Sequence, residues 1–140
     1  GVDYEAQAAI ELEALADGVH ADAWSSPVEM RAGQVVIDPT GWIAAAVRAH
    51  AAGTPVERSS AAFHAGLAEA VVEAVQAVAL QHPVSTVGLT GGVFANSVLS
   101  KACMRGLAEA GFRVLTHRVV PPNDGGLALG QVCVAGATLG

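Results

Sequence analysis

The sequence is poor in basic and aromatic residues. Its seven Lys and Arg residues are outnumbered by 13 Asp and Glu residues, which gives a formal charge of −6 over 140 residues. No basic stripe is visible, and this argues against duplex nucleic acid as a partner. Aromatic residues make up only 4%, so we expect a core of Ala, Val and Leu. Hydrophobic residues at 52% and charged residues at 14% exclude a disordered chain.

Cysteine is equally scarce, and Cys103 and Cys133 are widely separated. Such a pair forms neither a disulfide framework nor a CxxC-type zinc site, which favours a reducing, cytoplasmic location. The acidic beginning carries no signal peptide. No apolar run reaches the roughly 20 residues of a membrane span, so we expect no membrane partner. The chain begins with Gly1 rather than Met, which suggests a piece of a larger protein.

Apolar spacing and breaker residues predict five helices and three strands. A first helix over 4–16 is followed by a loop over 17–33 and a short strand over 34–37. Asp38-Pro39-Thr40 is a helix start with Asp38 as candidate cap, and Gly53 ends that helix. A further helix runs from 54 to 80. Strands over 84–89 and 112–116 then alternate with helices over 96–110 and 127–139, which predicts a parallel pair and an α/β fold.

The first candidate site is the segment 90–96, TGGVFAN, between a strand and a helix. Gly91 and Gly92 allow the backbone to approach a ligand closely. The following helix start favours an anion such as phosphate, and Asn96 can hydrogen-bond a nucleotide. The alternative is a tight turn with Asn96 as a local helix cap. The segment is not a Walker A loop, because no Gly-Lys-Ser/Thr follows.

The second candidate site is the segment 120–126, VPPNDGG, after the next strand. Because ligands bind at the carboxyl ends of strands in open α/β sheets, both glycine turns should meet at one edge. Asp124 could hold a hard cation beside phosphate oxygens. The alternative is that Asn123 or Asp124 is a helix cap.

The five histidines have no pair spaced three or four apart, so no helical metal pair exists. They are His20, His50, His64, His82 and His117. We expect His50 and His64 to be packing or surface residues, whereas His117 follows a strand end at the expected ligand edge. Both cysteines lie in apolar helices without basic neighbours that would lower a thiol pKa. Leu99, Cys103 and Leu107 are spaced four apart on one helix face, so we expect Cys103 to be a core residue.

Three segments carry a resemblance to a known family: 4–9 (YEAQAA), 90–96 (TGGVFAN) and 120–131 (VPPNDGGLALGQ). Together they resemble the C-terminal part of the HypF-type carbamoyltransferases, which mature [NiFe] hydrogenases. The resemblance implies a sugar kinase–Hsp70–actin (ASKHA) fold with a mostly parallel sheet and helices, of which residues 1–140 would be the second lobe. The first lobe, with a metal-binding histidine pair, and the carbamoyl-adenylate-forming domain are not in this sequence.

The resemblance also implies a reaction and site residues. Carbamoyl-adenylate, made from carbamoyl phosphate and ATP, would pass its carbamoyl group to the C-terminal cysteine of a HypE-type partner. Gly91, Gly92 and Asn96 would contact the nucleotide, and Glu5 would lie near the ribose. Asp124 would bind a divalent metal, with zinc, iron and magnesium all open. Glycine amides and this metal would neutralise phosphate charge and improve AMP as a leaving group.

Two departures and two alternatives accompany this interpretation. Ala6 stands where glycine is expected, and Thr90 where serine is common. An O-carbamoyltransferase of antibiotic tailoring would have similar phosphate and metal sites but a sugar hydroxyl as acceptor. A non-catalytic partner-binding domain is the third hypothesis, and it predicts exposed apolar helices that cause dimerisation.

Overall fold

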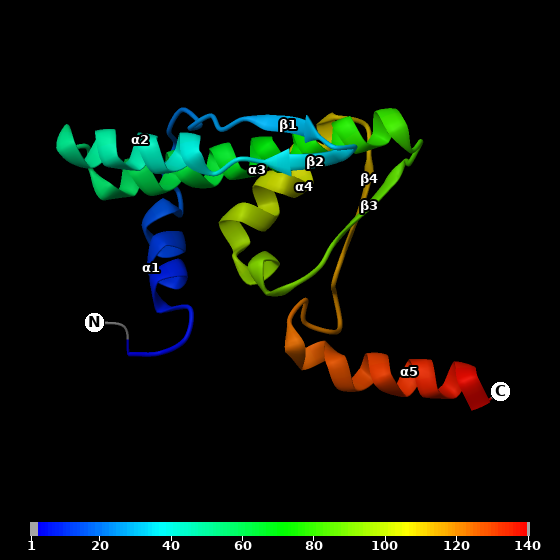
Figure 1. Cartoon of the computed structure of the whole chain (residues 1–140). Helices are drawn as coiled ribbons and strands as arrows, with labels where there is room; N and C mark the ends of the chain where they lie inside the picture. The colour runs from blue at the N-terminus through cyan, green and yellow to red at the C-terminus, as the bar shows by residue number, and fades with distance from the viewer. Residues whose placement is uncertain (1–2, 140) are drawn as a thin grey trace.

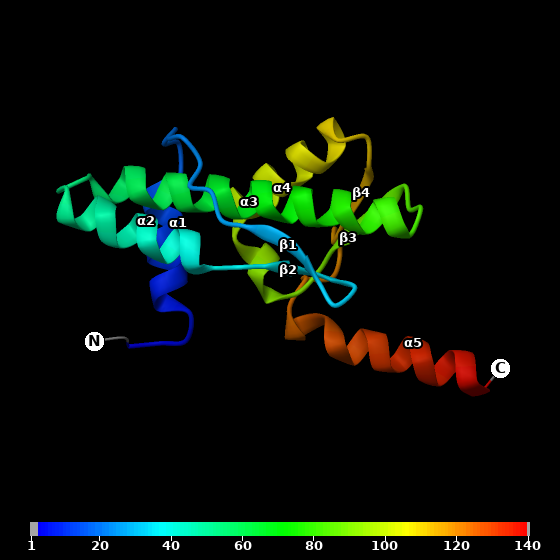
Figure 2. The same cartoon turned by 45° about the horizontal axis from the view of Figure 1, so that its top comes forward.

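The structure, a computed structural model, describes residues 3–139 and is built around one long helix. The elements, in chain order, are α1 (Gln7–Ala16), β1 (Val28–Arg31), β2 (Gln34–Ile37), α2 (Thr40–Ala51), α3 (Val56–Gln81), β3 (Thr86–Leu89), the 3₁₀ turn η1 (Gly92–Ala95), α4 (Ser97–Glu109), β4 (Arg113–Thr116), the 3₁₀ turn η2 (Asp124–Gly126) and α5 (Leu127–Leu139). Helices α1, α2 and α4 and the β1–β2 hairpin all contact α3 (Figure 1). Strands β3 and β4 lead away from this body to α5 (Figures 1 and 2).

The main core lies where α4 packs between α3 and the β3–β4 pair. Leu99, Cys103 and Leu107, predicted to share one face of the fourth helix, are each no more than 3% exposed. They pack against Ala68 of α3 and Leu89 of β3. The predicted core of small and aliphatic residues is therefore confirmed, with Cys103 at its centre.

The strands form two separate pairs instead of one mostly parallel sheet. Strands β3 and β4 are parallel, in the register Leu89↔Thr116, as predicted. Strands β1 and β2 form an antiparallel hairpin, so the α/β fold has a small parallel sheet of β3 and β4 only, and the prediction of a loop throughout 17–33 is wrong. The hairpin closes through Ala32 and Gly33, both with positive φ (50° and 80°). This is the backbone pattern of a tight type I′ turn.

Local side-chain hydrogen bonds mark the starts of two helices, α2 and α4. Asp38 accepts a hydrogen bond from the Thr40 backbone N–H (2.9 Å) ahead of α2. That bond, supported by Arg31, lowers the pKa of Asp38. Asn96 caps α4 by accepting from the Leu99 N–H, so α4 begins at Ser97 as its cap predicts. The first helix begins at Gln7, three residues later than predicted, after Ala6 in a left-handed conformation.

Helix α3 packs closely against its neighbours through small residues. Its buried residues are Ser60, Ala61, Ala62, His64, Gly66, Ala68 and Ala70. The Trp24 segment crosses this stretch, where its N–H donates to the Ala62 carbonyl (3.0 Å). A Cβ at Gly66 would lie 1.9 Å from the Trp24 carbonyl oxygen. The absent side chain is therefore what permits the crossing.

By length and composition alone, α3 could cross a membrane, and it is the one such helix within residues 3–139. Four charged residues interrupt it: Glu57, Arg58, Glu69 and Glu73. It contacts α1, α2, α4 and both hairpin strands, which is the arrangement of a central packing helix.

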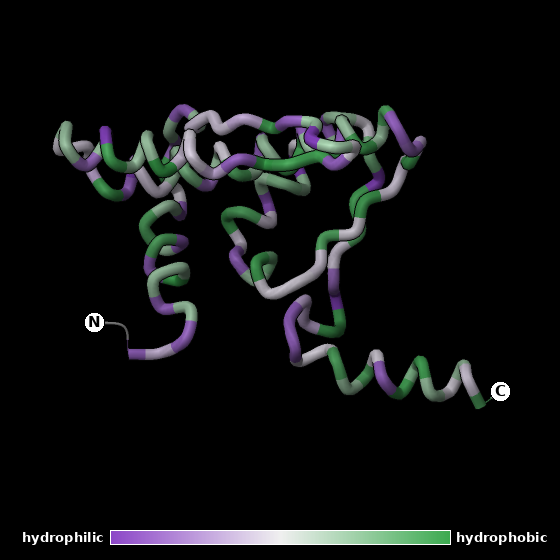
Figure 3. Tube along the Cα trace, in the orientation of Figure 1, coloured by the Kyte–Doolittle hydropathy of each residue, from purple (hydrophilic) through white to green (hydrophobic). Residues whose placement is uncertain are grey.

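Helix α5 projects from the body without burying any of its described residues. Figure 3 shows it as a largely hydrophobic segment at the end of the trace. Cys133 on this helix is exposed, so it differs from Cys103 in accessibility although both lie in apolar helices.

Candidate functional site

The carboxyl ends of β3 and β4 meet at one edge, where both glycine turns begin. Because Leu89 pairs with Thr116 in parallel register, the next residues, Thr90 and His117, are neighbours. The His117 Nε2 lies 2.9 Å from the Thr90 hydroxyl oxygen. This confirms the predicted common edge and places His117 on it.

The two turns are joined directly by a backbone hydrogen bond. The Gly91 N–H donates to the Pro122 carbonyl at 2.8 Å. Gly91 has a φ of 99°, a conformation that glycine adopts without the steric cost of a Cβ. The turn therefore needs glycine at position 91, but its amide hydrogen is already used within the protein. In this conformation Gly91 shapes the site and does not donate to a ligand.

A cavity of about 760 Å³ opens between the two turns and the start of α5. Gly91, Gly92 and Asp124 all line it. Its other polar residues include Thr90, His117 and Gln131, and its apolar residues include Val120, Pro121, Leu127 and Val134. A mostly apolar wall with a few convergent polar groups is the usual composition of a small-ligand site.

Gly92 keeps one wall of this cavity bare. A Cβ built at Gly92 would have Asn123 Cβ as its nearest neighbour, at 4.0 Å. A larger side chain would extend into the space between the turns. Gly92 is also the first residue of η1, and amides of a first helical turn have no acceptor within the helix. The glycine pair thus divides its roles between turn geometry and access.

The second turn is organised by Asn123. Its side-chain oxygen accepts from the Gly125 N–H (3.1 Å), and its carbonyl accepts from the Gly126 N–H (3.0 Å). The alternative prediction that Asn123 is a cap is confirmed. Asp124 is exposed beside it on the cavity, with its carboxylate left for another role.

The described residues do not by themselves form a metal centre. Across residues 3–139 no group of three or more His, Cys, Asp or Glu side chains is placed to hold an ion. Asp124 is the one carboxylate lining this cavity. A single exposed carboxylate suits one ligand of a hard cation, whose remaining ligands would come from elsewhere.

Asn96 and Glu5, the other predicted site residues, lie outside this cavity. The Asn96 side-chain oxygen accepts from the Leu99 N–H (2.9 Å), and its amide nitrogen lies 3.0 Å from His64 Nε2. Glu5 is exposed in the turn before α1, at the end of the molecule opposite α5 (Figure 1). The structure therefore brings together Gly91, Gly92 and Asp124 and leaves Asn96 beside them and Glu5 apart.

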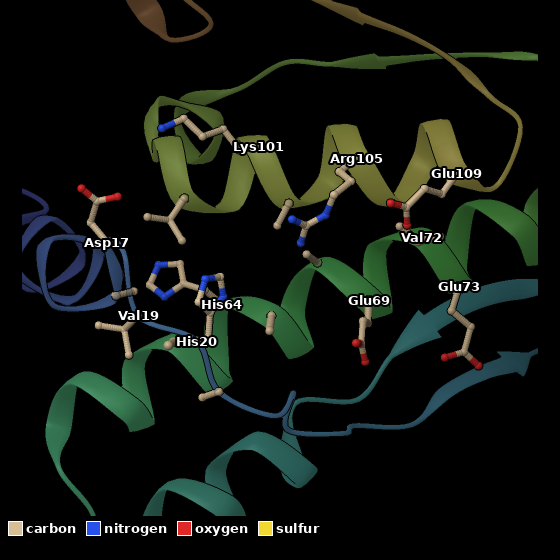
Figure 4. Close-up of a pocket in the computed structure, with 18 of the residues that line it drawn as sticks. Asp17, Val19, His20, His64, Glu69, Val72, Glu73, Lys101, Arg105 and Glu109 are labelled. Atoms are coloured by element: carbon tan, nitrogen blue, oxygen red, sulfur yellow. The ribbon is translucent and has the colours of Figure 1, made fainter.

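A second cavity, of about 640 Å³, lies between α3, α4 and the segment after α1. Glu69 and Glu73 of α3 and Arg105 and Glu109 of α4 all line it (Figure 4). His64 lines this cavity together with the exposed His20. No local sequence pattern predicts this cavity, because its walls come from three separate segments.

Burial distinguishes the two thiols. Desolvation raises the pKa of Cys103 to about 11, so this thiol stays protonated near neutral pH and does not act as a nucleophile. The prediction that Cys103 is a core residue is confirmed. His64 is buried, as the packing interpretation required.

Comparison with known proteins identifies close similarities along nearly the whole chain. The family model described as "Carbamoyltransferase, Kae1-like Domain, second subdomain" matches residues 1–131. A carbamoyltransferase HypF homolog of Cupriavidus necator is 41% identical over 94% of this chain and 34% of its own length. Carbamoyltransferase HypF of Rhodobacter capsulatus is 39% identical over 97% of this chain and 17% of its own length.

Two solved structures have the same fold over 99% of the chain. Full-length HypF in a phosphate- and nucleotide-bound form superposes with a TM-score of 0.88 at 29% identity, and T. kodakarensis HypF with 0.80 at 27%. The chain spans 18% of each of these structures, and about a third or less of the curated relatives cited above.

Proposed function

This chain belongs to the HypF carbamoyltransferase family, as the second subdomain of its Kae1-like domain, and from that premise we propose that it supplies one lobe of a nucleotide site for carbamoyl transfer. The observation that carries the proposal is the cavity shared by Gly91, Gly92 and Asp124. Its position outside the carboxyl ends of two parallel strands is where open α/β sheets bind ligands. Support also comes from the similar HypF structure, which is phosphate- and nucleotide-bound.

The ligand that we propose is carbamoyl-adenylate, made from carbamoyl phosphate and ATP. The apolar wall formed by Val120, Pro121 and Leu127 suits the adenosine part. The hydroxyl of Thr90 and the imidazole of His117, 2.9 Å apart where the glycine turn begins, suit phosphate oxygens. In this scheme residues 1–140 form the second lobe of an ASKHA-type domain, and the first lobe completes the ligand-binding site.

A divalent metal fits this site only as a shared ion. Asp124 would provide one carboxylate ligand, and phosphate oxygens and the first lobe would provide the rest. When bound, the ion would supply charge neutralisation at the phosphate. Asn123 holds the backbone around Asp124 through its bonds to Gly125 and Gly126. The protein therefore presents Asp124 from a constrained turn.

The transfer step assigns the attacking thiol to a partner protein. The sulfur of the C-terminal cysteine of a HypE-type acceptor would bond to the carbamoyl carbon, and the bond from that carbon to the AMP phosphate oxygen would break. The thiol proton leaves to solvent or a base, and AMP departs with the bonding electrons. This is the carbamoyl step of [NiFe] hydrogenase cyanide-ligand synthesis. The unpaired thiols of Cys103 and Cys133 are consistent with a reducing, cytoplasmic location.

The test is nucleotide binding and carbamoyl transfer in a complete carbamoyltransferase that carries this chain as its second subdomain. We expect Asp124→Asn to weaken metal-dependent AMP binding at least tenfold, roughly the loss seen when metal sites are perturbed. Gly92→Val should weaken AMP binding with or without metal, because it fills the cavity. Asp22→Asn, an exposed carboxylate that lines neither cavity, is the matched control. Unchanged AMP affinity in both site variants would disprove the assignment.

A further inference from the structure

His64 is a buried titratable group outside the nucleotide cavity, with both ring nitrogens engaged. It is 3% exposed on α3. Its Nδ1 lies 2.8 Å from the Ser60 carbonyl oxygen, and its Nε2 lies 3.0 Å from the Asn96 side-chain nitrogen. An imidazole in a stretch otherwise packed by alanine needs these partners, because burying an unpaired polar group is costly.

Only one assignment of donors and acceptors fits these contacts. A carbonyl oxygen only accepts, so His64 Nδ1 carries the hydrogen and donates to Ser60. The Nε2 atom of the neutral ring is then an acceptor, and it takes a hydrogen from the Asn96 amide. This orientation leaves the Asn96 side-chain oxygen to accept from the Leu99 N–H at 2.9 Å. The neutral ring of His64 therefore fixes which way the Asn96 amide faces.

Asn96 is the residue that ends the turn beginning at Gly91. At its start, this turn is tied to the second turn by the Gly91–Pro122 hydrogen bond (2.8 Å). At its end, it is tied to α3 by the Asn96–His64 contact (3.0 Å). Between the two ties lies η1, with Gly92 as its first residue. The turn that contributes Gly92 to the cavity wall is thus held in place at both of its ends.

We propose that His64 is a positioning residue, which acts through Asn96 to hold the Gly91–Asn96 turn in its ligand-binding geometry. The inference rests on the proposed function, since it concerns the same nucleotide site. Its chemical requirement is an acceptor atom at the place of Nε2. A side chain that only fills the volume does not meet this requirement.

Three substitutions distinguish the hydrogen-bond acceptor role of His64 from the space that its side chain fills. In His64→Gln, the side-chain oxygen reaches about the place of Nε2 and can accept from Asn96. His64→Leu keeps an apolar volume without any acceptor. His64→Asn keeps a donor near the place of Nδ1, facing Ser60, and lacks the outer acceptor. His20→Leu, at the exposed histidine of the same second cavity (Figure 4), is the matched control.

The measurement is AMP affinity, with KM and kcat of carbamoyl transfer, in the complete carbamoyltransferase carrying this chain. We expect His64→Gln and His20→Leu to stay within about threefold of the unsubstituted protein, and His64→Leu to raise Kd and KM about tenfold. A tenfold change is the size expected for one lost buried hydrogen bond. Where thermal unfolding shows that His64→Leu does not fold, His64→Asn takes its place with the same expectation.

A double-mutant cycle tests whether His64 acts through Asn96. We expect His64→Leu to add less than about twofold to the effect of Asn96→Ala, because both remove the same contact. Equal losses in His64→Gln and His64→Leu, or full additivity with Asn96→Ala, would overturn the proposal. Loss in Gly92→Val with no loss in His64→Leu would reject this inference and leave the proposed function standing. No loss in either would reject both.

Discussion

At the scale of single residues, Ala6 has a strained backbone at a position where the family resemblance leads us to expect glycine. Glycine is expected at this position, and the structure gives Ala6 a φ of 62° immediately before α1. A residue with a Cβ pays roughly 1–2 kcal/mol for this left-handed conformation. Relief of that strain is partly offset by the greater freedom of glycine in the unfolded chain.

Ala6→Gly should therefore raise the free energy of unfolding by about 1 kcal/mol. The measurement is urea-induced unfolding followed by circular dichroism. Ala9→Gly, at an exposed position inside α1, is the control, and it should lower the same quantity by about 1 kcal/mol. A loss of stability in both variants would mean that the left-handed conformation is not the conformation in solution.

The two thiols should differ sharply in reactivity. Cys103 is 0% exposed and burial raises its pKa to about 11, whereas Cys133 is exposed. Because the thiolate is the reactive form, a thiol-specific reagent at pH 8 should modify Cys133 rapidly and Cys103 only after unfolding. Raising the pH toward 11 should increase Cys103 modification, because the reactive thiolate of Cys103 becomes populated only as the pH approaches its raised pKa. In Cys133→Ser the one remaining thiol is that of Cys103. Rapid modification of this variant at pH 8 would contradict the buried position of Cys103.

Asn96 shows what the sequence could and could not give at this scale. The segment 90–96 predicted a turn with Asn96 as either a nucleotide contact or a cap, and the cap is confirmed. Its contact with His64, 32 residues earlier in the chain, has no local signal. The two meet because α3 packs against the start of α4, and only the tertiary arrangement contains that information.

At the scale of elements, the strand–helix alternation was predictable and the first hairpin was not. Apolar strands bounded by glycine and proline predicted the parallel β3–β4 pair and hence the common edge of the site. The β1–β2 hairpin was not predicted because its turn residues are Ala32 and Gly33, whereas the strongest sequence signal for such a turn is Asn-Gly or Asp-Gly. Cross-strand pairing overrides the weak turn preference of alanine in this hairpin.

Gly66 tests the close packing of α3. A Cβ at this position would lie 1.9 Å from the Trp24 carbonyl oxygen, the same oxygen that accepts from the Trp42 indole (2.9 Å). Gly66→Ala should therefore lower the free energy of unfolding by about 3 kcal/mol, at the upper end for overpacking. The readout is the midpoint of urea unfolding.

The matched control for Gly66→Ala is Gly136→Ala in α5. A Cβ at Gly136 would have no neighbour within 4 Å, so the substitution should raise stability by up to about 1 kcal/mol through helix propensity alone. If Gly66→Ala were as stable as the unsubstituted chain, the Trp24 segment would not cross α3 at this distance.

At the scale of the whole molecule, the exposed helix α5 forms part of the wall of the candidate site. Leu127 and Val134 of α5 line the cavity between the two glycine turns, yet each is more than 60% exposed. Val132 is 68% exposed as well. Nothing within residues 3–139 covers this apolar helix, and it projects from the body (Figures 1 and 3). Exposed contiguous apolar surface promotes association.

The chain on its own should therefore self-associate through α5 as its concentration rises. Val132→Lys with Leu129→Lys places charge on α5, and it should shift the weight-average mass toward the monomer in sedimentation or light scattering. Leu80→Lys is the matched control, because Leu80 is 89% exposed and lies at the end of α3 instead of on α5. Equal effects from both changes would mean that general solubility, and not α5, governs association. A concentration-independent monomer would contradict association through α5.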